Sequence, residues 1–73
     1  MTPEEQKQFI IATIKLRLDD FKSLWAKNYM ALKYNEPLGT DSSKKEVEAA
    51  KLNMKVAEEQ IAFFNNLLIE ESK

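Results

Sequence analysis

The sequence predicts an all-α fold: an antiparallel two-helix hairpin that dimerises into a four-helix bundle or enters a higher helical oligomer. Three observations lead to this prediction. The 73 residues include one glycine and two prolines, and most residues that interrupt helices lie in one segment near the middle. Apolar residues recur at helical spacing on both sides of that segment. A chain of this length is also too short to bury a large core by itself.

The first helix is expected over residues 3–34. Thr2 can cap its first turn, Pro3 suits the first helical position, and Glu5 completes a capping box. No glycine and no other proline occurs in that range. We expect Asn35 to end the helix in a left-handed conformation.

A turn is expected over residues 35–42, which contain the glycine and the second proline. The second helix is expected over residues 43–71, with Ser43 as its cap and Glu46 three residues later as the other half of a capping box. Because the connection is short, the two helices should lie antiparallel and form a single domain, residues 1–73.

Each helix carries one apolar stripe with alternating spacings of three and four residues, which is the pattern of a coiled-coil seam. The first helix contributes Ile11, Ile14, Leu18, Phe21, Trp25, Asn28 and Leu32. The second contributes Val47, Ala50, Met54, Ala57, Ile61, Phe64 and Leu68. Antiparallel partners, such as Ile14 with Phe64 or Phe21 with Ala57, have residue numbers that add up to 78 or 79. The polar member, Asn28, is expected either to fix the register by a buried hydrogen bond or to lie exposed near the turn.

A second apolar stripe remains on each helix after the seam is formed, and it predicts self-association. Seven residues are the expected oligomer interface: Leu52, Val56, Phe63 and Leu67 on the second helix, faced by Phe9, Leu16 and Met30 on the first. A homodimer is the simplest way to cover them, because each stripe can then meet its own copy. A helix from another protein is the competing partner.

The chain contains no cysteine and no histidine, which excludes disulfides, thiolate or imidazole zinc sites, a cysteine nucleophile and a histidine base. Adjacent carboxylates point about 100° apart around a helix and do not converge on a metal or substrate. We therefore expect no enzyme activity, no cofactor and no metal. The expected role is protein binding, as an adaptor, inhibitor or accessory protein.

Basic and aromatic residues toward the turn leave an alternative function open. Residues 22–55 hold seven lysines and four acids, a net charge of +3, and the rest of the chain has a net charge of −4. A nucleotide or nucleic acid could bind there or between protomers, through Arg17, Tyr29, Lys33, Tyr34, Lys44 and Lys45. The interleaved acids weaken the electrostatic attraction for nucleic acid.

The sequence also bears on the location and the origin of the protein. The longest apolar run has four residues and the amino terminus does not resemble a signal peptide, so we expect a cytoplasmic protein without a membrane contact. Ten lysines to one arginine is typical of A/T-rich coding sequences, such as those of low-GC bacteria or their phages.

Overall fold

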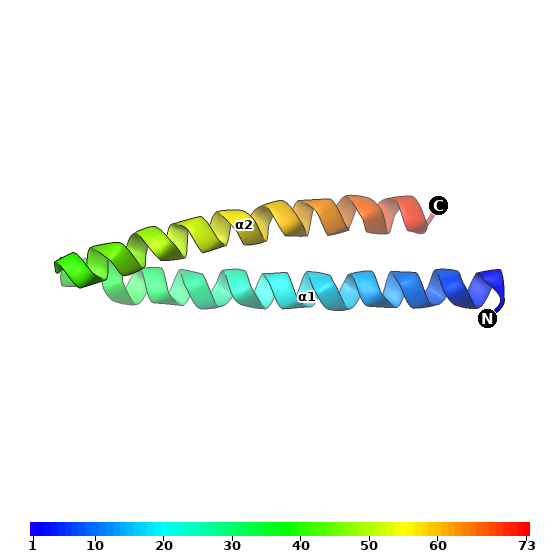
Figure 1. Ribbon diagram of the computed structural model, residues 1–73, viewed down its shortest axis with the longest axis horizontal. Helices are drawn as coiled ribbons and strands as arrows, with labels where there is room; N and C mark the ends of the chain where they lie inside the picture. The colour runs from blue at the N-terminus through cyan, green and yellow to red at the C-terminus, as the bar shows by residue number, and fades with distance from the viewer.

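A computed structural model describes all 73 residues and consists of two long antiparallel helices. Helix α1 covers Pro3–Asn35, a short 3-10 helix covers Glu36–Leu38, and helix α2 covers Asp41–Glu71. The hairpin is a rod of 57 × 15 × 13 Å, with both termini at one end and the turn at the other (Figure 1). The predicted helical hairpin is therefore confirmed.

Helix α1 begins as its sequence predicts. The Thr2 hydroxyl accepts a hydrogen bond from the Glu5 backbone N–H at 3.2 Å and donates to the Glu5 carboxylate at 3.1 Å. Pro3 occupies the first helical position, where the missing N–H leaves no intrahelical bond unmade. These contacts satisfy the start of the helix locally, without help from α2.

The turn differs from the expectation at one residue. Asn35 stays in the right-handed helical region, with φ −85° and ψ −28°, so the expected left-handed conformation is wrong there. The left-handed residue is Gly39, with φ 68°, after the 3-10 turn that contains Pro37. A residue without Cβ adopts this conformation at little steric cost, so the chain reverses at the glycine.

Helix α2 begins at Asp41, and its cap is Thr40, which corrects the predicted capping by Ser43. The Thr40 hydroxyl accepts from the Ser43 backbone N–H at 3.0 Å, while the Ser43 hydroxyl donates to the Thr40 carbonyl at 2.9 Å. Ser43 is buried, so its hydroxyl is used within the turn. The early start follows from Gly39, which places Thr40 directly after the reversal.

The seam is formed by the residues that the heptad pattern predicts. All fourteen predicted seam residues are buried or half-buried, and Ile14, Leu18, Ala50 and Ala57 are the most buried apolar ones. The same spacing continues to half-buried Asn35 on α1 and buried Ser43 on α2. The heptad repeat alone therefore identifies the contact line between the helices.

Hydrogen bonds and ring contacts across the seam place the helices slightly differently from the expected register. The Asn53 amide donates to the Asn28 side-chain oxygen at 3.2 Å, and the Phe21 ring stacks on Phe64 with centroids 5.8 Å apart. The two residue numbers in each of these pairs add up to more than the expected 78 or 79. Side chains lean toward the amino end of their own helix, so long side chains on antiparallel helices meet at higher sums than their backbones do. Asn28 is half-buried, so it is neither fully buried with its hydrogen bond nor fully exposed near the turn, which were the two expectations.

Candidate functional site

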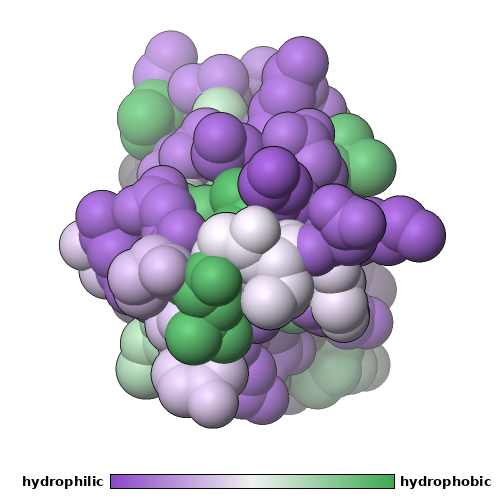
Figure 2. Space-filling model, turned by 90° about the vertical axis from the view of Figure 1, so that its left-hand side faces the viewer, coloured by the Kyte–Doolittle hydropathy of each residue, from purple (hydrophilic) through white to green (hydrophobic).

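The hairpin leaves most of its large apolar side chains uncovered. Five of the 73 residues are buried, and no large side chain is fully buried. Thirteen large apolar or aromatic residues are exposed: Met1, Phe9, Ile10, Leu16, Leu24, Tyr29, Met30, Tyr34, Leu38, Leu52, Val56, Phe63 and Ile69. Seen from the turn end, the surface is mostly hydrophilic with separate hydrophobic patches (Figure 2). Apart from Met1 and Leu38, the exposed apolar residues all belong to the two long helices.

One flank of the rod gathers these residues from both helices. The seam residues of each helix come in pairs spaced three residues apart, such as Ile11 with Ile14 on α1 and Ile61 with Phe64 on α2. Each residue turns the helix by about 100°, so in an antiparallel pair of helices the residues that directly precede the first member of each such pair lie on the same flank. Ile10, Arg17 and Leu24 lie along that line on α1, and Leu67 lies along it on α2. Val56 and Phe63 lie beside Leu67 on the same side of α2. We call the apolar face the set Ile10, Leu24, Val56, Phe63 and Leu67.

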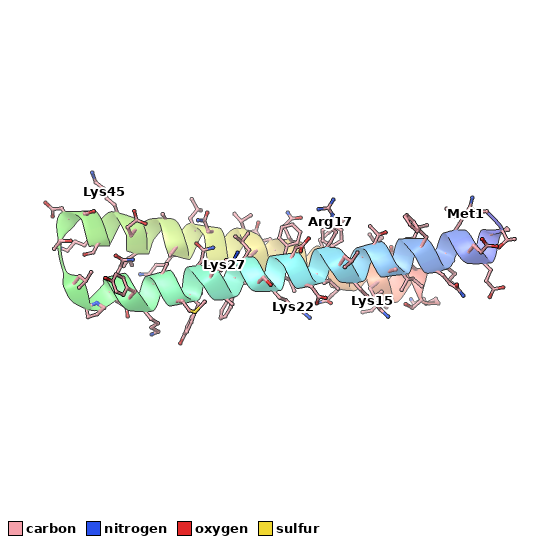
Figure 3. All side chains as sticks on the ribbon, turned by 90° about the horizontal axis from the view of Figure 1, so that it is seen from below. Met1, Lys15, Arg17, Lys22, Lys27 and Lys45 are labelled. Atoms are coloured by element: carbon pink, nitrogen blue, oxygen red, sulfur yellow. The ribbon has the colours of Figure 1, made fainter.

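The opposite flank carries six of the ten lysines and is called the lysine face: Lys15, Lys22, Lys33, Lys44, Lys51 and Lys55. In Figure 3 the labelled Lys15 and Lys22 point away from one side of α1, whereas Arg17 points away from the other. Acidic side chains interleave with these lysines, among them Glu36, Glu48 and Glu58. The lysine face is therefore a surface of mixed charge.

The structure separates the seven residues predicted for the oligomer interface. Phe9, Leu16 and Met30 are each more than 60% exposed and lie on the outer edge of α1, directly away from α2. Val56, Phe63 and Leu67 lie on the apolar face, and exposed Leu52 lies beside it on the outer edge of α2. Leu67 is already half-buried in the hairpin.

The sequence reasoning missed Ile10 and Leu24, although both are exposed on the apolar face. Ile10 directly follows Phe9 of the predicted stripe on the first helix, and Leu24 directly follows Ser23, which interrupts that stripe between Leu16 and Met30. Arg17 interrupts the line between Ile10 and Leu24. Their position in the sequence could have identified them, because they directly precede the seam residues Ile11 and Trp25 and must therefore lie on the flank.

The six candidate residues for an anion or nucleotide do not come together. Arg17 and Tyr34 lie on the side of the apolar face, whereas Tyr29, Lys33 and Lys44 lie on the side of the lysine face. The labelled Lys45 points outward near the turn (Figure 3). Within one hairpin, these residues form no common site.

Tyr29 belongs to a ladder of side chains that uses both faces of its ring. Trp25 stacks on it with centroids 5.4 Å apart, and the Lys33 ammonium lies 5.6 Å from its centroid. Trp25 and Lys33 stand four residues before and after Tyr29, so they cover opposite faces of the ring. The Trp25 indole N–H donates to Glu58 at 2.9 Å and ties the ladder to α2. A nucleobase would have to displace one of these neighbours in order to stack.

Two open hollows lie on the rod, one on each flank. The first, of about 260 Å³, is near the turn, with a mixed-charge lining of Asn35, Glu36, Gly39, Ser43, Lys44, Val47, Glu48 and Lys51. The second, of about 370 Å³, lies on the side of the apolar face and is lined by Arg17, Asp20, Phe21, Ser23, Leu24 and Lys27.

Charged groups are mostly unpaired within the hairpin. Of 11 basic and 12 acidic side chains, Lys33 and Glu36 form the one ion pair, at 3.9 Å. No three acidic side chains gather closely enough to bind a metal ion. Neither helix has the length and apolar character needed to cross a membrane.

No known family model matches this chain, and neither a curated protein nor a solved structure matches it.

Proposed function

We propose that this chain works by self-association: two hairpins pack through their apolar faces into a four-helix bundle, which acts as a protein-binding unit without catalysis. The observation that supports this proposal is the row of apolar side chains, most of them exposed, on a flank that carries fewer charged residues than the lysine face. A four-helix bundle covers one flank of each hairpin and leaves the other in water. The lysine face, with its many charged side chains, would be the flank that stays in water.

The dimensions of one hairpin support the need for a second. Its radius of gyration is 16.8 Å, whereas a compact domain of this length has about 11 Å. Its accessible surface is 5641 Å², against about 4,650 Å² for a compact monomer of this mass. The excess surface is what a partner would cover.

A dimer of such hairpins would bury a large interface. Two separate chains expose twice the 5641 Å² of one chain, whereas a compact protein of twice the mass exposes about 7,700 Å². Dimerisation would thus bury up to about 3,600 Å² in total, within the range of about 2,000–5,000 Å² for obligate homodimers. The area supports a permanent dimer better than a transient contact.

The mass in solution tests this proposal directly. We expect sedimentation equilibrium to give twice the chain mass of 8.5 kDa over micromolar concentrations. Phe63→Glu should shift the mass to that of a single chain, because two carboxylates would be buried in each dimer without a partner. A wild-type chain that stays at 8.5 kDa would overturn the proposal.

Ile69→Glu is the matched control. Ile69 and Phe63 are both 58% exposed on α2, but Ile69 lies on the side of the lysine face. The control should therefore keep the mass of the wild type. If both variants dissociate equally, the interface is not the apolar face.

A further inference from the structure

We infer that the two hairpins of the dimer pack head to tail, so that the turn of one lies beside the termini of the other. The two-fold axis then passes near Ser23 and Leu24 of α1 and near Ala57 and Glu58 of α2. This inference rests on the proposed dimer and adds its orientation and its axis.

The distribution of charge along the rod favours this orientation. Residues 22–55, the half that contains the turn, have a net charge of +3, and the remaining residues have −4. Face-to-face packing with both turns at one end would place like-charged halves together. Head-to-tail packing brings each basic half against an acidic half, which lowers the electrostatic energy of the dimer.

The position of the axis follows from the shape of the hairpin. The Asn53–Asn28 hydrogen bond joins two short side chains, which places their backbones close to the same level along the rod. With that register, the last residue of α2, Glu71, is level with Ile10, and α1 extends beyond it (Figure 1). The part of the rod that contains both helices therefore runs from Ile10 to the turn at Glu36, and its midpoint is near Ser23. A two-fold axis at the midpoint gives the largest overlap of two such parts.

This axis brings complementary side chains together on α1, which packs against the partner's α1. Asp20 and Lys27 lie equally far from the axis, on opposite sides of it, and both line the hollow beside the apolar face. Asp20 therefore meets the partner's Lys27, and Lys27 meets the partner's Asp20. Leu24 lies next to the axis and meets its own copy.

On α2 the same axis passes near Ala57 and Glu58, and Val56 and Phe63 of the apolar face lie on opposite sides of it. Both residues are exposed in the single hairpin, by 45% and 58%. The apolar face of each α2 therefore meets the partner's α2 on both sides of the axis. The charge pair on α1 was not used to place this axis.

A distance between the two turns tests the orientation. The chain has no cysteine, so Leu38→Cys, at an exposed site in the turn, provides one spin-label site per chain. Head-to-tail packing should place the two labels about 44 Å apart, at 1.5 Å per residue from the axis. Packing with both turns at one end would place them within about 25 Å, which spans two helix diameters. A dimer with the shorter distance overturns the orientation alone, whereas a monomeric mass overturns the proposed dimer as well.

Charge reversal tests the position of the axis. Asp20→Lys should weaken the dimer about tenfold, because two lysine pairs replace two ion pairs worth up to about a factor of five each. Adding Lys27→Asp restores opposite charges and should restore the dimer constant to that of the wild type. Lys22→Asp, on the lysine face, is the control that should not rescue Asp20→Lys. A double variant no tighter than Asp20→Lys alone would overturn the assignment of the axis.

Discussion

The side chain of Asn28 shows how one polar residue occupies an otherwise apolar seam. Its amide donates to the Leu24 carbonyl at 2.8 Å, and its oxygen accepts from Asn53 at 3.2 Å. One bond stays within α1 and the other crosses to α2. The residue thus satisfies its polar atoms while giving up the apolar burial that a leucine would provide.

Asn28→Leu should therefore stabilise the hairpin. Replacement of a half-buried amide by an apolar side chain is expected to add about 1 kcal/mol to the free energy of unfolding. Circular dichroism during thermal unfolding, at one fixed chain concentration, measures the effect. Asn66→Leu is the control, because Asn66 is exposed on the outer edge of α2 and offers no apolar neighbours across the seam. A lower midpoint for Asn28→Leu than for wild type would show that the Asn28–Asn53 bond dominates.

At the scale of whole helices, the sequence predicts the two helices and their contact line well because these depend on short-range patterns. The capping box at Thr2 and Glu5 and the heptad stripes are local in the chain, and the structure contains both. The start of α2 was harder to predict, because Thr40 and Ser43 can both cap a helix. The choice depends on the left-handed Gly39 and on the burial of Ser43, which are features of the folded turn.

The cap assignment makes a separate prediction. Thr40→Ala should lower the free energy of unfolding by about 1 kcal/mol, because the Ser43 N–H loses its side-chain acceptor. Urea unfolding measures this change, and Ser42→Ala is the control, since Ser42 is exposed and makes no side-chain hydrogen bond in the turn. Equal losses in both variants would contradict the assignment of Thr40 as the cap.

The choice of the apolar face is harder to predict than the seam. Phe9, Leu16 and Met30 follow a strict repeat of seven with Ser23, which makes them conspicuous, yet they lie directly away from α2. Ile10 and Leu24 lack such a repeat because Arg17 stands between them. Only the position of each residue relative to the seam distinguishes an outer edge from a flank.

The whole molecule is a thin rod. In the proposed dimer, its thermal stability depends on the association of two chains. If unfolding also separates a dimer, the thermal midpoint must rise with chain concentration. With an enthalpy of about 100 kcal/mol for two chains, the rise should be about 5 °C for each tenfold increase in concentration. Scanning calorimetry at several concentrations measures it. A constant midpoint is the behaviour expected of a hairpin that folds alone.

Trp25, the single tryptophan, gives this molecule a built-in optical probe. Its indole is half-buried in the seam, stacks on Tyr29 and donates to Glu58 of α2, away from the apolar face. Its fluorescence emission therefore responds to the two helices of one chain moving apart. Light scattering responds instead to the two chains moving apart. Recording both signals from one sample during unfolding shows whether the chains separate before the helices do.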